Sequence, residues 1–155
     1  MTQPAHIIRE YKPADQAAAV KVWFNAGKRE YTYLAGWREM TPEKATAIFC
    51  EVILRDCKLW VAASDTSQVA GFLALNQSYL DRLYVDPACQ RGGCGSALME
   101  KAKALSPAGL ELHTHQQNHG ARRFYERHGF RAVKFAISPA PELAPDVEYH
   151  WRPNT

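Results

Sequence analysis

A glycine-rich segment between two periodic runs constrains the fold of this chain more than any other feature. It follows a strand-like run over residues 80–85 and precedes a helix-like run over residues 96–104. A glycine turn that opens a helix gathers backbone N–H groups at the positive end of the helix dipole, where phosphates bind. The same residues are also compatible with an ordinary turn that uses glycine for positive φ. Both interpretations predict a strand–turn–helix unit. The segment consists of Gln90, Arg91, Gly92, Gly93, Cys94 and Gly95.

Length and charge narrow the class of protein. With 155 residues, the chain is expected to form a single domain over residues 1–155. A hydrophobic content of 46% and a charged content of 23% are typical of globular proteins. The net charge of +3 and the lack of a long basic run argue against a nucleic-acid partner. A modest arginine cluster suits a small anionic ligand better than a polymer: Arg82, Arg91, Arg122, Arg123 and Arg127.

Targeting and metal-binding signals are missing from the sequence. Neither a signal peptide nor an apolar run near eighteen residues is apparent, so we expect a cytoplasmic protein without a membrane span. The cysteines form no C-x-x-C pair, and no histidine pair has zinc-finger spacing. We therefore expect no metal site and four free thiols: Cys50, Cys57, Cys89 and Cys94.

Periodicity predicts a mixed order of helices and strands. Helices are expected over residues 13–27, 41–56, 96–104 and 118–127, and residues 28–40 are irregular and aromatic. Strands are expected over residues 6–10, 59–63, 69–75, 80–85, 110–114, 131–138 and 147–151. This order predicts an α/β (α+β) fold with a single mixed, mostly antiparallel sheet flanked by helices.

Two motifs together resemble the GNAT superfamily of N-acetyltransferases. The first is Q/R-x-x-G-x-G/A, present here as Gln90, Gly93 and Gly95. The second is N-x-x-A-x-x-x-Y-x-x-x-G-F, present here as Asn118, Ala121, Tyr125, Gly129 and Phe130. A Rossmann fingerprint fails because Leu98 stands where its third glycine belongs, and no Gly-Lys-Ser/Thr completes a Walker loop.

The resemblance implies acetyl-coenzyme A as the donor. Its pyrophosphate is expected on the N–H groups from Arg91 to Ser96, with the Arg91 side chain either bound to phosphate or simply solvated. The pantetheine arm is expected between two splayed parallel strands, residues 80–85 and 110–114. Backbone groups of Leu83, Tyr84 and Val85 would hold it there and polarise the thioester carbonyl.

Tyr125 is the expected general acid. A phenol beside the sulfur can protonate the leaving thiolate, and Asn118, Arg122 and Tyr125 at i, i+4 and i+7 share one helical face toward the coenzyme. The alternative is that Tyr125 is a core aromatic residue beside Phe124. Because Cys89 and Cys94 belong to the phosphate loop, we expect direct transfer rather than an acyl-enzyme.

A base must deprotonate the acceptor amine. Asp81 is the first candidate because alternation gives it the same face as Leu83 and Val85; the alternative is that it pairs with Arg82 or Arg131. Glu30 is the second candidate. His113 and His115 are the third.

The acceptor pocket is expected to involve Glu30, Tyr31, Tyr33, Trp37 and His113, with the loop 138–145 at its rim. The first expectation is a small-molecule amine as the acceptor. The alternatives are a protein or peptide N-acetyltransferase, and a non-catalytic acyl-coenzyme A-binding module. The resemblance also implies a possible homodimer through the C-terminal strands, with Tyr149 and Trp151 as its apolar patch.

Overall fold

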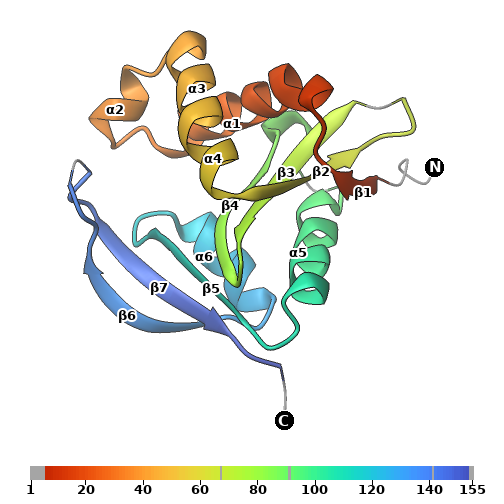
Figure 1. Cartoon of the computed structure of the whole chain (residues 1–155). Helices are drawn as coiled ribbons and strands as arrows, with labels where there is room; N and C mark the ends of the chain where they lie inside the picture. Colours follow the sequence, from red (N-terminus) through yellow and green to blue (C-terminus); the bar gives the residue numbers. More distant parts are fainter. Residues whose placement is uncertain (1–5, 67, 91, 141, 154–155) are drawn as a thin grey trace.

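One mixed sheet forms the centre of the molecule (Figure 1). The computed structural model describes residues 6–66, 68–90, 92–140 and 142–153. Within these ranges the sheet has seven strands in the order β1-β2-β3-β4-β5-β7-β6. Every neighbouring pair is antiparallel except β4 and β5, as the sequence predicted. The strands are β1 Ile7–Glu10, β2 Lys58–Ala63, β3 Val69–Asn76, β4 Tyr79–Val85, β5 Leu110–His115, β6 Arg131–Ile137 and β7 Pro145–Trp151.

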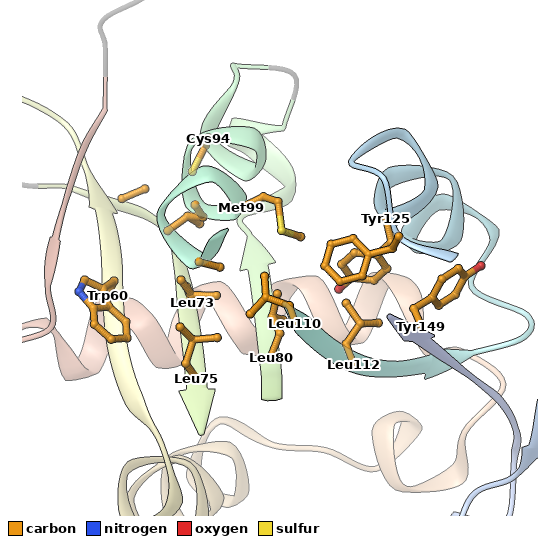
Figure 2. Close-up of a cluster of buried hydrophobic side chains, with 14 of the residues drawn as sticks. Trp60, Leu73, Leu75, Leu80, Cys94, Met99, Leu110, Leu112, Tyr125 and Tyr149 are labelled. Atoms are coloured by element: carbon orange, nitrogen blue, oxygen red, sulfur yellow. The ribbon is translucent and has the colours of Figure 1, made fainter. Parts of the chain in front are cut away.

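Helices cover both faces of the sheet (Figure 1). On one face α1 and α3 enclose a core with Trp23, Phe49 and Phe72. On the other face α5 and α6 enclose the cluster of Figure 2, where Met99 and Tyr125 point toward the sheet. A π-helical segment, Phe49–Ile53, joins α3 to α4. The helices are α1 Gln16–Glu30, α2 Ala35–Arg38, α3 Pro42–Ile48, α4 Leu54–Asp56, α5 Cys94–Leu105 and α6 His119–Arg127.

Capping and glycine chemistry set the helix boundaries. The Thr41 hydroxyl accepts a hydrogen bond from the Lys44 N–H at 3.2 Å, which confirms the predicted start before Pro42. Helix α1 continues three residues beyond Gly27, where the sequence predicted its end. A Cβ at position 27 would lie 2.2 Å from the Trp37 ring of α2, so this glycine makes room for an indole within the helix.

Strands β4 and β5 separate soon after they meet. Their registered pairing in the described residues is Tyr79 opposite Glu111, and the strands diverge beyond it. This confirms the predicted splayed parallel strands. The β3–β4 register also shifts, because Ala74 faces Arg82 whereas Leu75 faces Leu80, so Asp81 has no opposite residue. Such a bulge interrupts the alternation of side chains along the strand.

The prediction that Tyr149 belongs to an exposed apolar patch on β7 is wrong. Tyr149 is 0% exposed, because it faces the α6 side of the sheet and joins the core. The large exposed hydrophobic side chains of this region lie on β6 instead, at Val133, Phe135 and Ile137.

Two predictions from the sequence can be compared directly with the described residues. None of the helices found there has both the length and the apolar character to cross a bilayer. All four cysteines are free.

Candidate active site

A cavity of about 1090 Å³ opens where β4 and β5 diverge. One half is bordered by β4, the start of α5 and the inner face of α6, and the other half by the end of α1 and the loop after β6. Most of the predicted site residues line it. They are Glu30, Tyr31, Trp37, Asp81, Leu83, Tyr84, Val85, Gln90, Gly93, Cys94, Gly95, Ser96, His113, Asn118 and Tyr125.

The glycine-rich segment forms the start of α5. Gly93 is its N-cap, with a φ of 82° that favours glycine, and no side chain caps the helix. A Cβ at Gly95 would lie 3.2 Å from the Phe124 ring. The helix begins at Cys94, two residues before the predicted start, so its first turn presents N–H groups to the cavity from the loop itself. Gly92 does not line the cavity, and Arg91 lies outside the described residues.

Tyr125 lies on α6 and lines the cavity. It also belongs to the core, with ring centroids 5.7 Å from Phe130 and 6.2 Å from Tyr149. Both sequence interpretations of this tyrosine are therefore compatible with its position. Burial raises the pKa of Tyr125 well above its ordinary value, so the phenol is protonated at neutral pH.

Asn118 connects α6 to the end of α1. Its Oδ1 accepts a hydrogen bond from the Ala121 N–H at 3.1 Å, which caps α6. Its Nδ2 donates to Glu30 Oε2 at 3.5 Å. Burial raises the pKa of Glu30, and the hydrogen bond from Asn118 opposes part of that change. A carboxyl group of raised pKa thus lies in the cavity with Tyr125.

Asp81 borders the cavity, but its carboxylate pairs with the neighbouring Arg82. The Arg82 guanidinium in turn lies 5.5 Å from the centroid of the Trp23 ring. Burial and then the Asp81 charge raise the pKa of the Cys57 thiol to about 12. The bulge explains why simple alternation from Leu83 and Val85 does not describe Asp81, and the Arg82 pairing is the alternative that the sequence left open.

Aromatic side chains form the cavity wall near the end of α1. Tyr31 and Tyr84 join their hydroxyls at 2.7 Å, and the Tyr31 ring lies 5.6 Å from Trp37 between centroids. Behind this wall, the Tyr33 hydroxyl bonds to His115 Nδ1 at 2.8 Å, and His115 Nε2 bonds to Glu142 Oε2 at 3.1 Å. This chain of hydrogen bonds joins three distant segments: the segment after α1, strand β5 and the loop after β6.

Two of the predicted site residues do not line the cavity, and a third lines it while bonded to a neighbouring tyrosine. Arg122 and Tyr33 do not line the cavity. The Arg122 Nε donates to the Tyr149 hydroxyl at 3.0 Å, so the predicted common face holds for Asn118 and Tyr125 and excludes Arg122. His113 lines the cavity and its Nδ1 bonds to the Tyr79 hydroxyl at 2.9 Å.

Several lining residues escaped prediction, including Trp23, Arg29, Phe124 and Asp146. Phe124 and Arg127 also line the cavity. Both lie within two residues of Tyr125 in the sequence, so the motif around Tyr125 could have been used to predict them. The position of Asp146 at the cavity depends on the register of β5 with β7, and this register cannot be predicted from the sequence.

Comparison with known proteins places this geometry in a family. A model of the acetyltransferase (GNAT) domain matches residues 55–132, half of the chain. The peptidyl-lysine N-acetyltransferase YjaB of Salmonella typhimurium is 28% identical over 126 residues, which cover 81% of this chain and 83% of the relative. The peptidyl-lysine N-acetyltransferase YiaC of Escherichia coli is 26% identical over 140 residues, which cover 88% and 91%.

Solved structures share the fold. The apo form of YjaB from Escherichia coli superposes with a TM-score of 0.79 at 24% identity, over 94% of this chain and 97% of that one. The PaiA N-acetyltransferase of Thermoplasma acidophilum, solved in complex with coenzyme A, has a TM-score of 0.70 at 20% identity, over 96% and 99%.

Proposed function

Because this chain belongs to the GNAT acetyltransferase family, we propose that it transfers an acetyl group from acetyl-coenzyme A to a lysine side chain of a protein or peptide. N-acetyl transfer follows from the family, and the acceptor is the proposal. The observation that carries it is the similarity over most of the chain to two peptidyl-lysine N-acetyltransferases. This similarity favours the protein or peptide alternative over the small-molecule amine that the sequence first suggested.

The first turn of α5 is suited to the pyrophosphate of coenzyme A. The N–H groups at Cys94 and beyond lie at the positive end of the helix dipole, and Gly93 and Gly95 keep side chains out of their approach. The backbone of Leu83 and Val85 borders the same cavity where β5 has moved away. An extended pantetheine arm fits this unpaired strand edge.

In our mechanism Glu30 accepts the proton that the lysine ammonium loses. Its raised pKa brings the carboxyl closer to the pKa range of a base working at neutral pH, whereas the Asp81 charge is occupied by Arg82. The neutral nitrogen attacks the thioester carbonyl carbon and forms a tetrahedral intermediate. The C–S bond then breaks, and the Tyr125 hydroxyl gives its proton to the departing thiolate. The acylated nitrogen still carries two protons, and solvent takes one of them to leave the neutral amide. Solvent also returns a proton to the Tyr125 phenolate and removes the proton held by Glu30.

The cysteines of the phosphate loop support direct transfer without an acyl-enzyme. Burial raises the pKa of the Cys94 thiol to about 11, and burial also raises that of Cys89. Such thiols hold little thiolate at neutral pH and are weak nucleophiles.

An acceptor panel tests the proposal. We expect the full chain to acetylate lysine-containing peptides and the Tyr125→Phe variant to lose about 10²-fold in kcat, because the general acid is gone. Coenzyme A affinity, measured by calorimetry, should stay unchanged in that variant. Turnover of small primary amines without turnover of any peptide would refute the acceptor class. Coenzyme binding without transfer to any acceptor would instead favour a non-catalytic acyl-coenzyme A-binding module.

A further inference from the structure

Three carboxylate–imidazole pairs line one face of the β5–β7 ladder. Directly opposed residues of antiparallel strands share a face, and the pairs are Glu111 with His150, His113 with Glu148, and His115 with Asp146. The alternate residues Val147 and Tyr149 point to the opposite face, into the core beneath α6. The paired face therefore leads away from the core, and its His115–Asp146 end borders the cavity.

The carboxylates of the two outer pairs, Glu111 with His150 and His113 with Glu148, have partners within the protein. Glu111 accepts a hydrogen bond from Arg152 at 3.1 Å. Glu148 bonds to His150 Nε2 at 2.6 Å and lies 3.5 Å from His113 Nε2, and Lys134 stands opposite it on β6. The outer end of the face therefore offers no unmatched negative charge.

The inner pair is different. Both ring nitrogens of His115 are engaged, by Tyr33 and by Glu142, so the imidazole has no nitrogen left for Asp146. Asp146 is only 8% exposed and lines the cavity. Within the described ranges, neither a hydrogen bond nor an ion pair reaches its carboxylate. Lys134 borders the adjoining recess without an ion pair to it. The carboxylate oxygens of Asp146 face the cavity rather than a protein partner, so a cation arriving in the cavity can pair with them without displacing a bond within the protein.

The cationic side chains of the cavity do not supply this partner. Arg82 is paired with Asp81, and Arg29 stands beside Glu30 in sequence, where its charge lowers the pKa of that carboxyl. Arg127 comes from α6, on the donor side. The end of the cavity between α1 and the loop after β6, where the proposed acceptor would enter, therefore keeps the carboxylate of Asp146 for an incoming positive charge. Glu142 lies at the same end, and its Oε1 is left beside the Oε2 that bonds to His115.

We propose that Asp146, assisted by Glu142, binds the side-chain charge of a lysine or arginine that flanks the acetylated lysine. This specificity site rests on the proposed function. The reacting nitrogen must lose its charge beside Tyr125 and Glu30 before it attacks, and a close ion pair would stabilise the ammonium and oppose that loss. A flanking cation keeps its charge throughout the reaction, so it is the better match for a fixed carboxylate.

Two matched peptides test this site. They share one lysine and differ only in whether the adjacent residues are arginine or alanine. For the full chain we expect kcat/KM to be about tenfold higher on the arginine peptide, the smaller end of the range for a buried charged hydrogen bond. Asp146→Asn should remove that preference by lowering kcat/KM on the arginine peptide alone. The control Asp65→Asn, an exposed carboxylate in the β2–β3 turn, should keep the preference.

Glu142→Gln provides a second route if Asp146→Asn folds poorly. Its side chain is 47% exposed, so the change is expected to reduce the arginine preference without unfolding the protein. Equal loss of activity on both peptides in both variants would overturn the proposal, as would a wild-type chain that does not distinguish the peptides. A preference for a small diamine over both peptides would also overturn it. Failure to acetylate either peptide despite normal coenzyme binding refutes the proposed function itself, and the flanking-charge site with it.

Discussion

The raised pKa of Glu30 favours its proposed role as a base but lowers the stability of the folded protein when the carboxyl is ionised. Its carboxyl is held in the cavity at the end of α1, with one hydrogen bond from Asn118, and burial raises its pKa. A folded-state pKa above the ordinary 4.5 means that the folded protein prefers the protonated group. The contribution to stability is therefore complete below the unfolded pKa and is lost as pH rises through the folded pKa. Ionised Glu30 destabilises the fold at neutral pH.

Glu30→Gln should separate catalysis from stability. We expect lower kcat/KM at neutral pH, loss of the rise of kcat/KM with pH through the raised pKa, and a higher free energy of unfolding than wild type at pH 7. The stability difference should shrink as pH falls below the unfolded value near 4.5, when both side chains are neutral. Denaturant titrations across pH measure it, with the exposed Glu51→Gln as the control. Full activity in Glu30→Gln at every pH would exclude Glu30 as the base.

The sequence predicted which individual residues line the cavity better than it predicted the contacts between them. Asn118 and Tyr125 were predicted from a helical motif, and both line the cavity because local periodicity determines which face they share. Asp81 also lines the cavity, but alternation could not predict the face of its side chain, because the bulge in β4 depends on how β3 pairs with it. The bond chain through Tyr33, His115 and Glu142 joins segments far apart in sequence, so only the tertiary fold brings it together.

Among the elements, the loop before α5 is the most constrained. Gly93 holds a left-handed conformation at the N-cap, and the first helical turn depends on it. The loop and helix were predicted from glycine spacing, since backbone freedom is a local property. The end of α1 was predicted too early because Gly27 resembles a stop signal, whereas packing against Trp37 lets the helix continue through it.

Gly93→Ala should weaken both the helix start and the coenzyme site. An alanine in the left-handed region costs about 1–2 kcal/mol of stability, and the distorted turn no longer aligns its N–H groups. We expect the Kd for coenzyme A to rise about tenfold, equivalent to about 1.4 kcal/mol. Calorimetry and thermal unfolding measure both effects. Gly36→Ala is the control, because its Cβ would meet open space within α2. An unchanged Kd in Gly93→Ala would contradict the assignment of this loop to the pyrophosphate.

The whole molecule consists of two half-sheets with a thin connection. Strands β1–β4 form one half and β5–β7 the other, and β4 and β5 register only near Tyr79 and Glu111 in the described residues. Each half has its own antiparallel hydrogen bonds, so the halves can open with different free energies. A coenzyme bound between β4 and β5 would contact both.

Coenzyme A should therefore couple the two halves. Without it, we expect amide hydrogen exchange to be faster in β5 and β7 than in the central strands β2 and β3. With the coenzyme at about 100 times its Kd, binding adds about 2.7 kcal/mol to the stability of the folded state. The exchange rates of the two halves should then converge. Equal rates before addition, or slowing confined to α5, would show that the gap does not separate two cooperative units.

The contact between Gly27 and Trp37 affects how the acceptor range of such a protein can diversify. The indole occupies space that exists only because position 27 lacks a side chain, and it supports the Tyr31 ring at the cavity wall. A single added methyl group would displace Trp37 and loosen that wall. Changes at Glu142 or Asp146 leave the Gly27–Trp37 packing untouched, so new acceptor preferences are more accessible there. Positions 27 and 37 must vary together or stay fixed.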